Sequence, residues 1–202
     1  MKRDKLIQAM TLLALATLGA LASAQNTITT AEREGLMFMR EEEKLARDVY
    51  TVLANKWGEQ PFGNIVRSEQ SHMDAVKRLL DEFRIPDPAK DMKAGHFKNP
   101  TLQKLYTDLV KSGTVTREAA FRVGATIEDL DIYDLRRLQK EVNNAQILSV
   151  YAQLERGSRN HLRAFARNLS RTGLRYEPAY ISPADYKQII ESPQEKGGRW
   201  GG

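Results

Sequence analysis

In residues 62–83, FGNIVRSEQSHMDAVKRLLDEF, apolar side chains recur every three or four positions, and a glutamate and a histidine fall within the same series. Steps of three and four keep residues on one face of an α-helix, which is the face that a helical bundle buries. The stretch therefore predicts a helix whose buried face carries polar groups near its middle. That face comprises Phe62, Ile65, Glu69, His72, Val76, Leu79 and Phe83.

Three further stretches show the same spacing and the same polar interruption. They predict three more helices that meet the first one in a four-helix bundle. Because no alternating strand pattern appears, the expected fold class is all-α. The three faces are Leu36, Met39, Glu43, Ala46, Tyr50, Leu53 and Trp57; Phe121, Gly124, Glu128, Asp131, Leu135, Leu138 and Val142; and Ile147, Tyr151, Leu154, Ser158, His161 and Phe165.

Polar residues on four buried faces predict a metal centre. Buried carboxylates are costly unless they are paired, hydrogen-bonded or bound to metal. Four carboxylates balance the charge of two divalent ions, and two neutral imidazoles complete a mixed nitrogen and oxygen set that suits iron or manganese. The expected ligands are Glu43, Glu69, His72, Glu128, Asp131 and His161.

Several of these residues have a structural alternative. Glu69 and His72 could form a hydrogen-bonded core pair, and His161 could be an ordinary core histidine. Asp131 could face an arginine or lysine, or cap a local break beside Asp129 and Asp134. Tyr50 could be a core tyrosine, could donate a hydrogen bond to a ligand, or could act as a redox-active phenol. The apolar spacing places Glu43 on the buried face, so Glu41 and Glu42 are expected to be solvated.

Two further features are open to more than one interpretation. Glu155 lies off the fourth face and is at best a peripheral ligand. A row of arginines along the fourth predicted helix forms either a solvated face or a docking surface for an acidic partner or a membrane. The row contains Arg156, Arg159, Arg163, Arg167, Arg171 and Arg175.

Capping residues and breakers set the expected helix limits. The first helix begins at Thr29 or Thr30 and ends near Trp57, and the second covers about residues 62–83. A long crossing connection and a short helix, about residues 101–111, precede the third helix, which Thr116 caps and which ends near residue 142. Asn143 or Asn144 caps the fourth helix, which ends near residue 172. A last short helix is expected within residues 182–190, in one domain that covers residues 25–192 and precedes a disordered tail, 193–202.

Residues 1–24 have the features of a secretory signal peptide. Three basic residues precede an apolar run from Met10 to Leu21, and Ala22-Ser23-Ala24 fits the cleavage pattern. The alternative is an uncleaved N-terminal anchor. Cleavage would place the protein in a bacterial periplasm or outside the cell, without stable membrane insertion. Export argues against nucleic acid as a partner, although the formal charge is +5.

The run Glu43-x-x-Ala46-x-x-x-Tyr50, followed by Glu69-x-x-His72 and Glu128, resembles the helix signatures of ferritin-like proteins such as rubrerythrin and bacterioferritin. The segments MREEEKLARDVY (39–50), SEQSHMDAV (68–76), IEDLDIYDL (127–135) and GSRNHLRAF (157–165) look more closely like the family known as domain of unknown function 2202. This resemblance covers residues 34–186.

The ferritin-like resemblance implies a bundle with a long crossover between its second and third helices, around a di-iron or di-manganese site. Carried onto this chain, it implies Glu43, Glu69, His72, Glu128 and His161 as ligands. The chain departs from the pattern at Ser158, where a glutamate is expected, and Asp131 could supply the missing carboxylate.

Three functions are compatible with these patterns. The first is a ferroxidase- or peroxidase-type oxidoreductase that oxidises Fe²⁺ with oxygen or peroxide. The second is a non-enzymatic protein that binds, stores or delivers metal. The third is an interaction module without metal, whose inward acids would pair with arginines such as Arg47 or Arg122. The sequence also leaves a homo-oligomer open.

Overall fold

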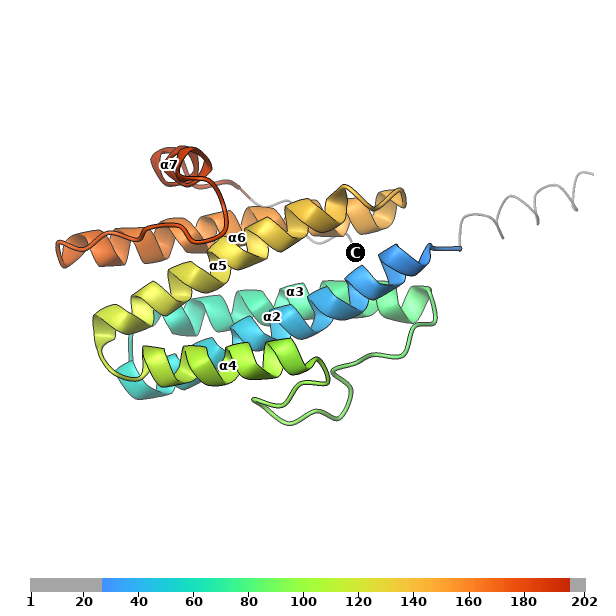
Figure 1. Cartoon of the computed structure of the whole chain (residues 1–202), viewed down its shortest axis with the longest axis horizontal. Coiled ribbons are helices and arrows are strands. Elements are labelled where there is room, and N and C mark those ends of the chain that lie inside the picture. The colour runs from blue at the N-terminus through green and yellow to red at the C-terminus, as the bar shows by residue number, and fades with distance from the viewer. Residues whose placement is uncertain (1–26, 197–202) are drawn as a thin grey trace, which may run out of the picture.

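The structure is a computed structural model that describes residues 27–196. The expected signal peptide, residues 1–24, lies outside the described residues. Within residues 27–196 the chain forms helices and no strand, which confirms the all-α class (Figure 1). The helices are α2 (Thr30–Trp57), α3 (Gln60–Glu82), α4 (Pro100–Gly113), α5 (Arg117–Gln139), α6 (Ala145–Arg171) and α7 (Pro183–Glu191).

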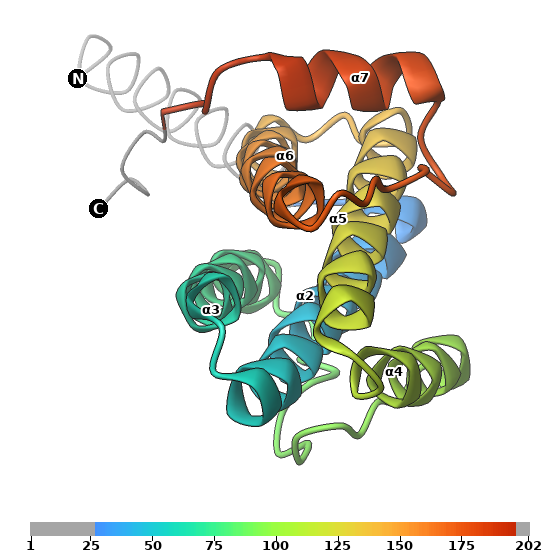
Figure 2. The ribbon, with the colours of Figure 1, turned by 90° about the vertical axis from the view of Figure 1, so that its left-hand side faces the viewer.

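Helices α2, α3, α5 and α6 form a four-helix bundle. Short links make α2 antiparallel to α3 and α5 antiparallel to α6, and these two pairs pack against each other through α2 with α5 and α3 with α6. The connection from α3 to α5 returns along the bundle, so that α3 and α5 run in the same direction (Figure 1). Helix α4 belongs to this connection and packs on α2 and α5 (Figure 2).

The helix ends follow the capping residues. Thr29 forms a capping box with Glu32, and Gly58 ends α2 in the left-handed conformation, with φ of 67°. Thr116 caps α5, and Asn144 caps α6 through the backbone N–H groups of Gln146 and Ile147. Because these signals are local in sequence, each observed end lies within about three residues of the expected one.

Glu32 joins the start of α2 to the start of α6. One carboxylate oxygen accepts a hydrogen bond from the backbone N–H of Thr29 at 2.8 Å. The other accepts from the N–H groups of Asn143 and Asn144 at 2.9 and 2.8 Å. Although burial opposes the charged form, these N–H donors together hold the pKa of Glu32 below its ordinary value. A single carboxylate therefore ties together one end of the bundle.

Helix α2 is buried on its outer side as well as its inner side. Glu41 and Glu42, which were expected to be solvated, are both buried, so that expectation is wrong. Glu41 accepts hydrogen bonds from the backbone N–H groups of Lys98 and Asn99. Lys44 pairs with Asp48 at 2.6 Å and donates to carbonyls of the same crossover. The crossover therefore covers the face of α2 that the four-residue spacing would leave to solvent.

The segment after α6 is also fastened to the bundle. Asp129 on α5 accepts hydrogen bonds from the Tyr176 hydroxyl and from the N–H groups of Ala179, Tyr180 and Ile181. Residues 193–196, which we expected within the disordered tail, lie against α6 because Glu195 pairs with arginines there. Residues 197–202 lie outside the described residues.

Glycine allows a close approach of α5 and α6. A Cβ atom placed on Gly124 would lie 2.5 to 2.7 Å from ring atoms of Phe165, which is closer than carbon atoms pack. Phe165 also contacts Tyr50 and Phe62, with ring centroids 5.5 Å apart in both cases. The absence of a side chain at Gly124 thus sets how near the two helices come.

We expect Gly124→Ala to lower the free energy of unfolding by about 1–3 kcal/mol, because the added methyl group overpacks the core. Urea denaturation followed by circular dichroism measures the change. Gly63→Ala is the matched control, since a Cβ atom there meets nothing within 4 Å and should stabilise the helix by about 0.5–1 kcal/mol. Equal stabilities for the two variants would contradict the packing argument.

Candidate metal centre

Each long helix contributes to a polar cluster in the bundle core. The six residues expected as ligands are all buried, with exposed fractions of 9% or less. Five of them form two overlapping groups in which one potential ligand atom per residue lies within 4.8 Å of the others. Glu69 belongs to both groups. The first group is Glu43, Glu69 and His72, and the second is Glu69, Glu128 and His161.

In the first group, His72 faces two carboxylates from adjacent helices. Its Nδ1 atom lies 3.1 Å from Glu43 Oε2 and 2.8 Å from Glu69 Oε2. The edge of the ring that carries Nε2 lies against Gly157 of α6, where an added Cβ atom would be 2.5 Å from Nε2. Gly157 therefore leaves the space that this orientation of His72 needs.

In the second group, His161 has a similar environment. Its Nδ1 atom lies 2.9 Å from Glu69 Oε1 and 3.4 Å from Glu128 Oε1. The Nε2 atom shares a hydrogen bond with Ser68 Oγ at 3.0 Å. The centroids of the two imidazole rings lie 5.7 Å apart. Both histidines direct Nδ1 toward the carboxylate of Glu69, which the two groups share.

Asp131 lies beside these groups and belongs to neither of them. Its Oδ2 atom accepts a hydrogen bond from Ser158 Oγ, while its Oδ1 atom is buried without a hydrogen-bond partner. Ser158, which replaces the glutamate expected from the ferritin-like pattern, thus binds the carboxylate of Asp131. The other carboxylate oxygen of Asp131, Oδ1, remains available to a cation.

Tyr50 supports the centre from α2. Its hydroxyl donates a 2.6 Å hydrogen bond to Glu128 Oε1 and lies 3.3 Å from the carbonyl of Gly124. Tyr50 is therefore a hydrogen-bond donor to a candidate ligand, as one interpretation of the sequence expected. Donors of this kind orient metal ligands and tune their basicity.

Within residues 27–196, the ion pairs of Glu43, Glu69 and Glu128 are with His72 and His161, and no lysine or arginine pairs with these carboxylates or with Asp131. Arg47 pairs instead with Asp48 at 2.7 Å and donates to Gln70, and Arg122 donates to the carbonyl of Arg175. The arginine pairing that a metal-free interaction module predicts is therefore not found at these two arginines.

The donor set fits a metal better than it fits an internal hydrogen-bond network. Ligand atoms about 2.1 Å from one ion and at right angles lie about 3.0 Å apart, close to the separations around both histidines. Protonated imidazoles would give similar distances, and a protonated His161 would donate from Nδ1 to Glu69 Oε1 at 2.9 Å. Glu43 Oε1 and Asp131 Oδ1, both buried, would still lack a hydrogen-bond partner.

Burial and mutual repulsion change the pKa values of the cluster. Burial, partly offset by His72, raises the pKa of Glu43 to about 8. Burial and the nearby carboxylates raise the pKa of Asp131 well above its usual range. Burial also opposes the charged form of Glu69, but His161 and His72 outweigh it and hold its pKa below the ordinary value. A bound cation would relieve the repulsion that these shifts record.

Glu42 is a polar core residue that the sequence interpretation missed. It is buried, neither carboxylate oxygen has a hydrogen-bond partner, and its pKa is raised by burial and by Asp131 and Asp134. Asp134, three residues after Asp131, was the available signal, because it extends the acidic side of α5 toward Glu42. Carboxylates therefore continue beyond the two ligand groups.

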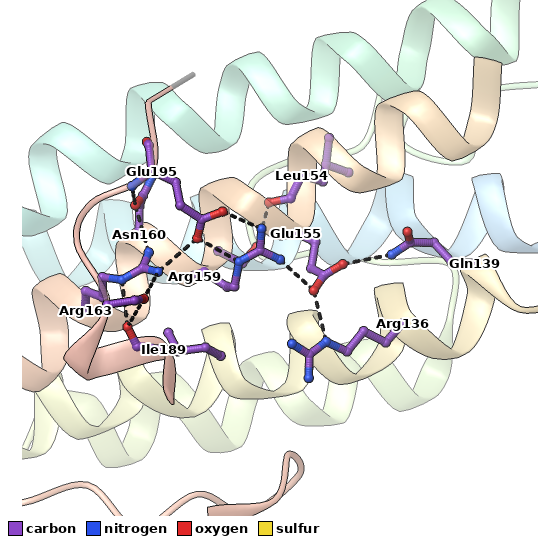
Figure 3. A network of polar contacts seen from close by, with 11 residues as sticks. Arg136, Gln139, Leu154, Glu155, Arg159, Asn160, Arg163, Ile189 and Glu195 are labelled. Carbon is purple, nitrogen blue, oxygen red and sulfur yellow. Dashed lines mark hydrogen bonds and ion pairs between the residues drawn. The ribbon is translucent and has the colours of Figure 1, made fainter. Parts of the chain in front are cut away.

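Glu155 takes no part in the cluster. It accepts hydrogen bonds from Arg136 at 2.9 Å, Arg159 at 2.6 Å and Gln139 at 3.0 Å on the outer side of α5 and α6 (Figure 3). Arg163 in the arginine row is also not solvated. It is buried and donates to the carbonyl of Ile189 and to Glu195.

Comparisons with known proteins agree with this helical architecture. The chain belongs to the family described as an uncharacterized protein domain, DUF2202, whose model matches residues 32–193. It is 53% identical over 170 residues to Uncharacterized protein MJ0754 of Methanocaldococcus jannaschii, a match that covers 84% of this chain and 92% of that protein.

A solved structure also resembles this chain. The crystal structure of hypothetical protein MJ0754 from Methanococcus jannaschii superimposes with a TM-score of 0.82 at 53% identity. The match covers 84% of this chain and 97% of the other. Among residues 27–196, no helix is long and apolar enough to cross a membrane.

We expect the metal-free protein to lose stability as the pH rises from about 6 to about 9. His161 is held protonated by Glu69 and Glu128 against the effect of burial, and its pKa is raised to about 10. The stability that protonated His161 contributes is therefore complete below about pH 6.5, its pKa in the unfolded chain, and is lost as the pH rises toward 10. Glu43 adds to this loss of stability between about pH 4.5, its pKa in the unfolded chain, and about pH 8, its pKa in the folded protein.

Thermal unfolding of chelator-treated protein measures this effect, with an expected Tm decrease of roughly 5 °C between pH 6 and pH 9. His161→Gln should make the dependence shallower. A Tm that rises over this interval, or a variant with the same slope as the native chain, would contradict the assignment.

Proposed function

We propose that this chain is an exported, ferritin-like carboxylate protein that holds two iron or manganese ions and oxidises Fe²⁺ with oxygen or peroxide. The observation that carries the proposal is the pair of overlapping ligand groups that share Glu69. Export rests on the sequence of residues 1–24 alone.

The residues can be assigned roles in this proposal. Glu69 would contact both ions, since His72 and His161 lie at opposite oxygens of its carboxylate. Glu43 and Glu128 would each bind one of the ions. Asp131, which Ser158 holds by a hydrogen bond, would be a further oxygen donor. Bound iron or manganese would supply the redox chemistry that oxidation of Fe²⁺ requires.

Tyr50 would hold Glu128 in position through its hydroxyl donor. The surrounding apolar side chains, which include Val76 and Phe165, are fully buried and would restrict the access of water. The chain contains no cysteine and therefore no rubredoxin-type centre of its own. Electrons would come from Fe²⁺ or from an external donor.

Metal content tests the first part of the proposal. We expect mature protein, residues 25–202, to hold about two ions per chain after exposure to Fe²⁺ or Mn²⁺, because two divalent ions balance four carboxylates. Mass spectrometry measures the ratio. Glu69→Ala/His72→Ala should lose both ions, because Glu69 is common to the two groups.

The matched control is Glu34→Ala/His96→Ala, which removes the same residue types at exposed positions and should keep full metal content. A ratio near one would mean that Asp131 and Ser158 do not complete a second site. An empty native chain that is folded like the control would overturn the proposal in favour of an interaction module.

The rate of Fe²⁺ oxidation separates an oxidoreductase from a storage protein. We expect loaded native protein to oxidise added Fe²⁺ over many turnovers with oxygen or peroxide, followed by absorbance of the ferric product. Glu69→Ala/His72→Ala should oxidise it no faster than buffer. Stoichiometric metal binding without turnover under either oxidant would instead favour the storage function.

A further inference from the structure

A cavity of about 500 Å³ lies between α3 and α6 and reaches the candidate metal centre. Its wall includes His161 and Ser68, the pair that shares a hydrogen bond. Gly157 also lines it, and the ring of His72 lies behind that glycine. The cavity therefore ends at the imidazole of His161, and one residue of its wall separates it from the imidazole of His72. The inference drawn from it rests on the proposed function.

The lining of the cavity has a distinct chemistry. Arg167 and Arg171 are exposed on its α6 side, one helical turn apart. No carboxylate is present among the described residues that line it. The remaining polar lining is mostly carboxamide, from Gln60, Asn64, Asn160, Asn168 and Gln194. This combination attracts anions and offers them hydrogen-bond donors, while it repels cations.

The C-terminal segment supplies one wall. Gln194 lines the cavity, and Glu195 beside it pairs with Arg159 at 2.6 Å and Arg163 at 2.9 Å (Figure 3). The backbone N–H and carbonyl of Glu195 bond to the side chain of Asn160, which also lines the cavity. The two arginines hold the pKa of Glu195 near 2 although burial opposes this, so the pairing persists at neutral pH.

We propose that this cavity admits small anions, and not metal cations, to the candidate metal centre. The charge of the carboxylate cluster lies behind His161, while the cavity itself presents only positive and neutral groups. An anionic substrate or ligand would therefore meet Arg167 and Arg171 first and then the carboxamides.

The absence of cysteine allows a direct test. Ala164→Cys places one thiol in the cavity wall, and its rate of modification is measured with a sulfonate-bearing and a trimethylammonium-bearing methanethiosulfonate at low salt. The ratio of the anionic to the cationic rate is divided by the same ratio for free cysteine. This removes intrinsic reactivity and any effect of the arginines on the thiolate.

We expect the normalised ratio to exceed one by about tenfold, and to fall by about fivefold when Arg167→Gln/Arg171→Gln is added. Arg33→Gln/Arg78→Gln is the matched control, because it removes two exposed arginines that do not line the cavity. It should leave the ratio unchanged.

A normalised ratio of one or less, or the same ratio with and without Arg167 and Arg171, would overturn the proposal of anion access. Metal content measured on the same preparations is an independent result. A chain that binds neither iron nor manganese would overturn the proposed function whatever the ratio, so the two failures can be distinguished.

Discussion

The burial of several carboxylates at one level of the bundle is the constraint on which the rest of the structure depends. Glu43, Glu69 and Glu128 come from three helices, and within the described residues the basic partners recorded for them are His72 and His161. Their charges oppose folding unless protons or cations compensate. Capping, the close approach at Gly124 and the docked crossover all support helices that must keep this cluster together.

The helices could be predicted because their signals are local. Apolar spacing identifies a buried face, and Thr29, Thr116 and Asn144 mark helix starts within a few residues. The burial of Glu41 and Lys44 could not be predicted in the same way. It depends on contacts with residues 93–99 of the crossover, which lie about fifty positions further along the chain. The apolar spacing within α2 contains no information about those contacts.

The candidate site was predictable as far as it depends on the register within single helices. That register placed Glu43, Glu69, His72, Glu128 and His161 on buried faces, and the structure brings these five together. Asp131 was expected among the ligands but lies outside both groups, where Ser158 binds one of its oxygens. Glu42 was missed because a single stripe assigns one inward residue per turn, whereas α2 is enclosed on several sides. Tertiary packing decided both cases.

Gly157 has a consequence for how this protein can vary. Because the ring of His72 occupies the space where a side chain at position 157 would lie, substitutions at the two positions are not independent. A relative with a larger residue at 157 must carry a smaller one at 72, or turn the imidazole away from α2. The identity of residue 157 is therefore a simple marker for whether a homologous chain has retained the histidine in this orientation.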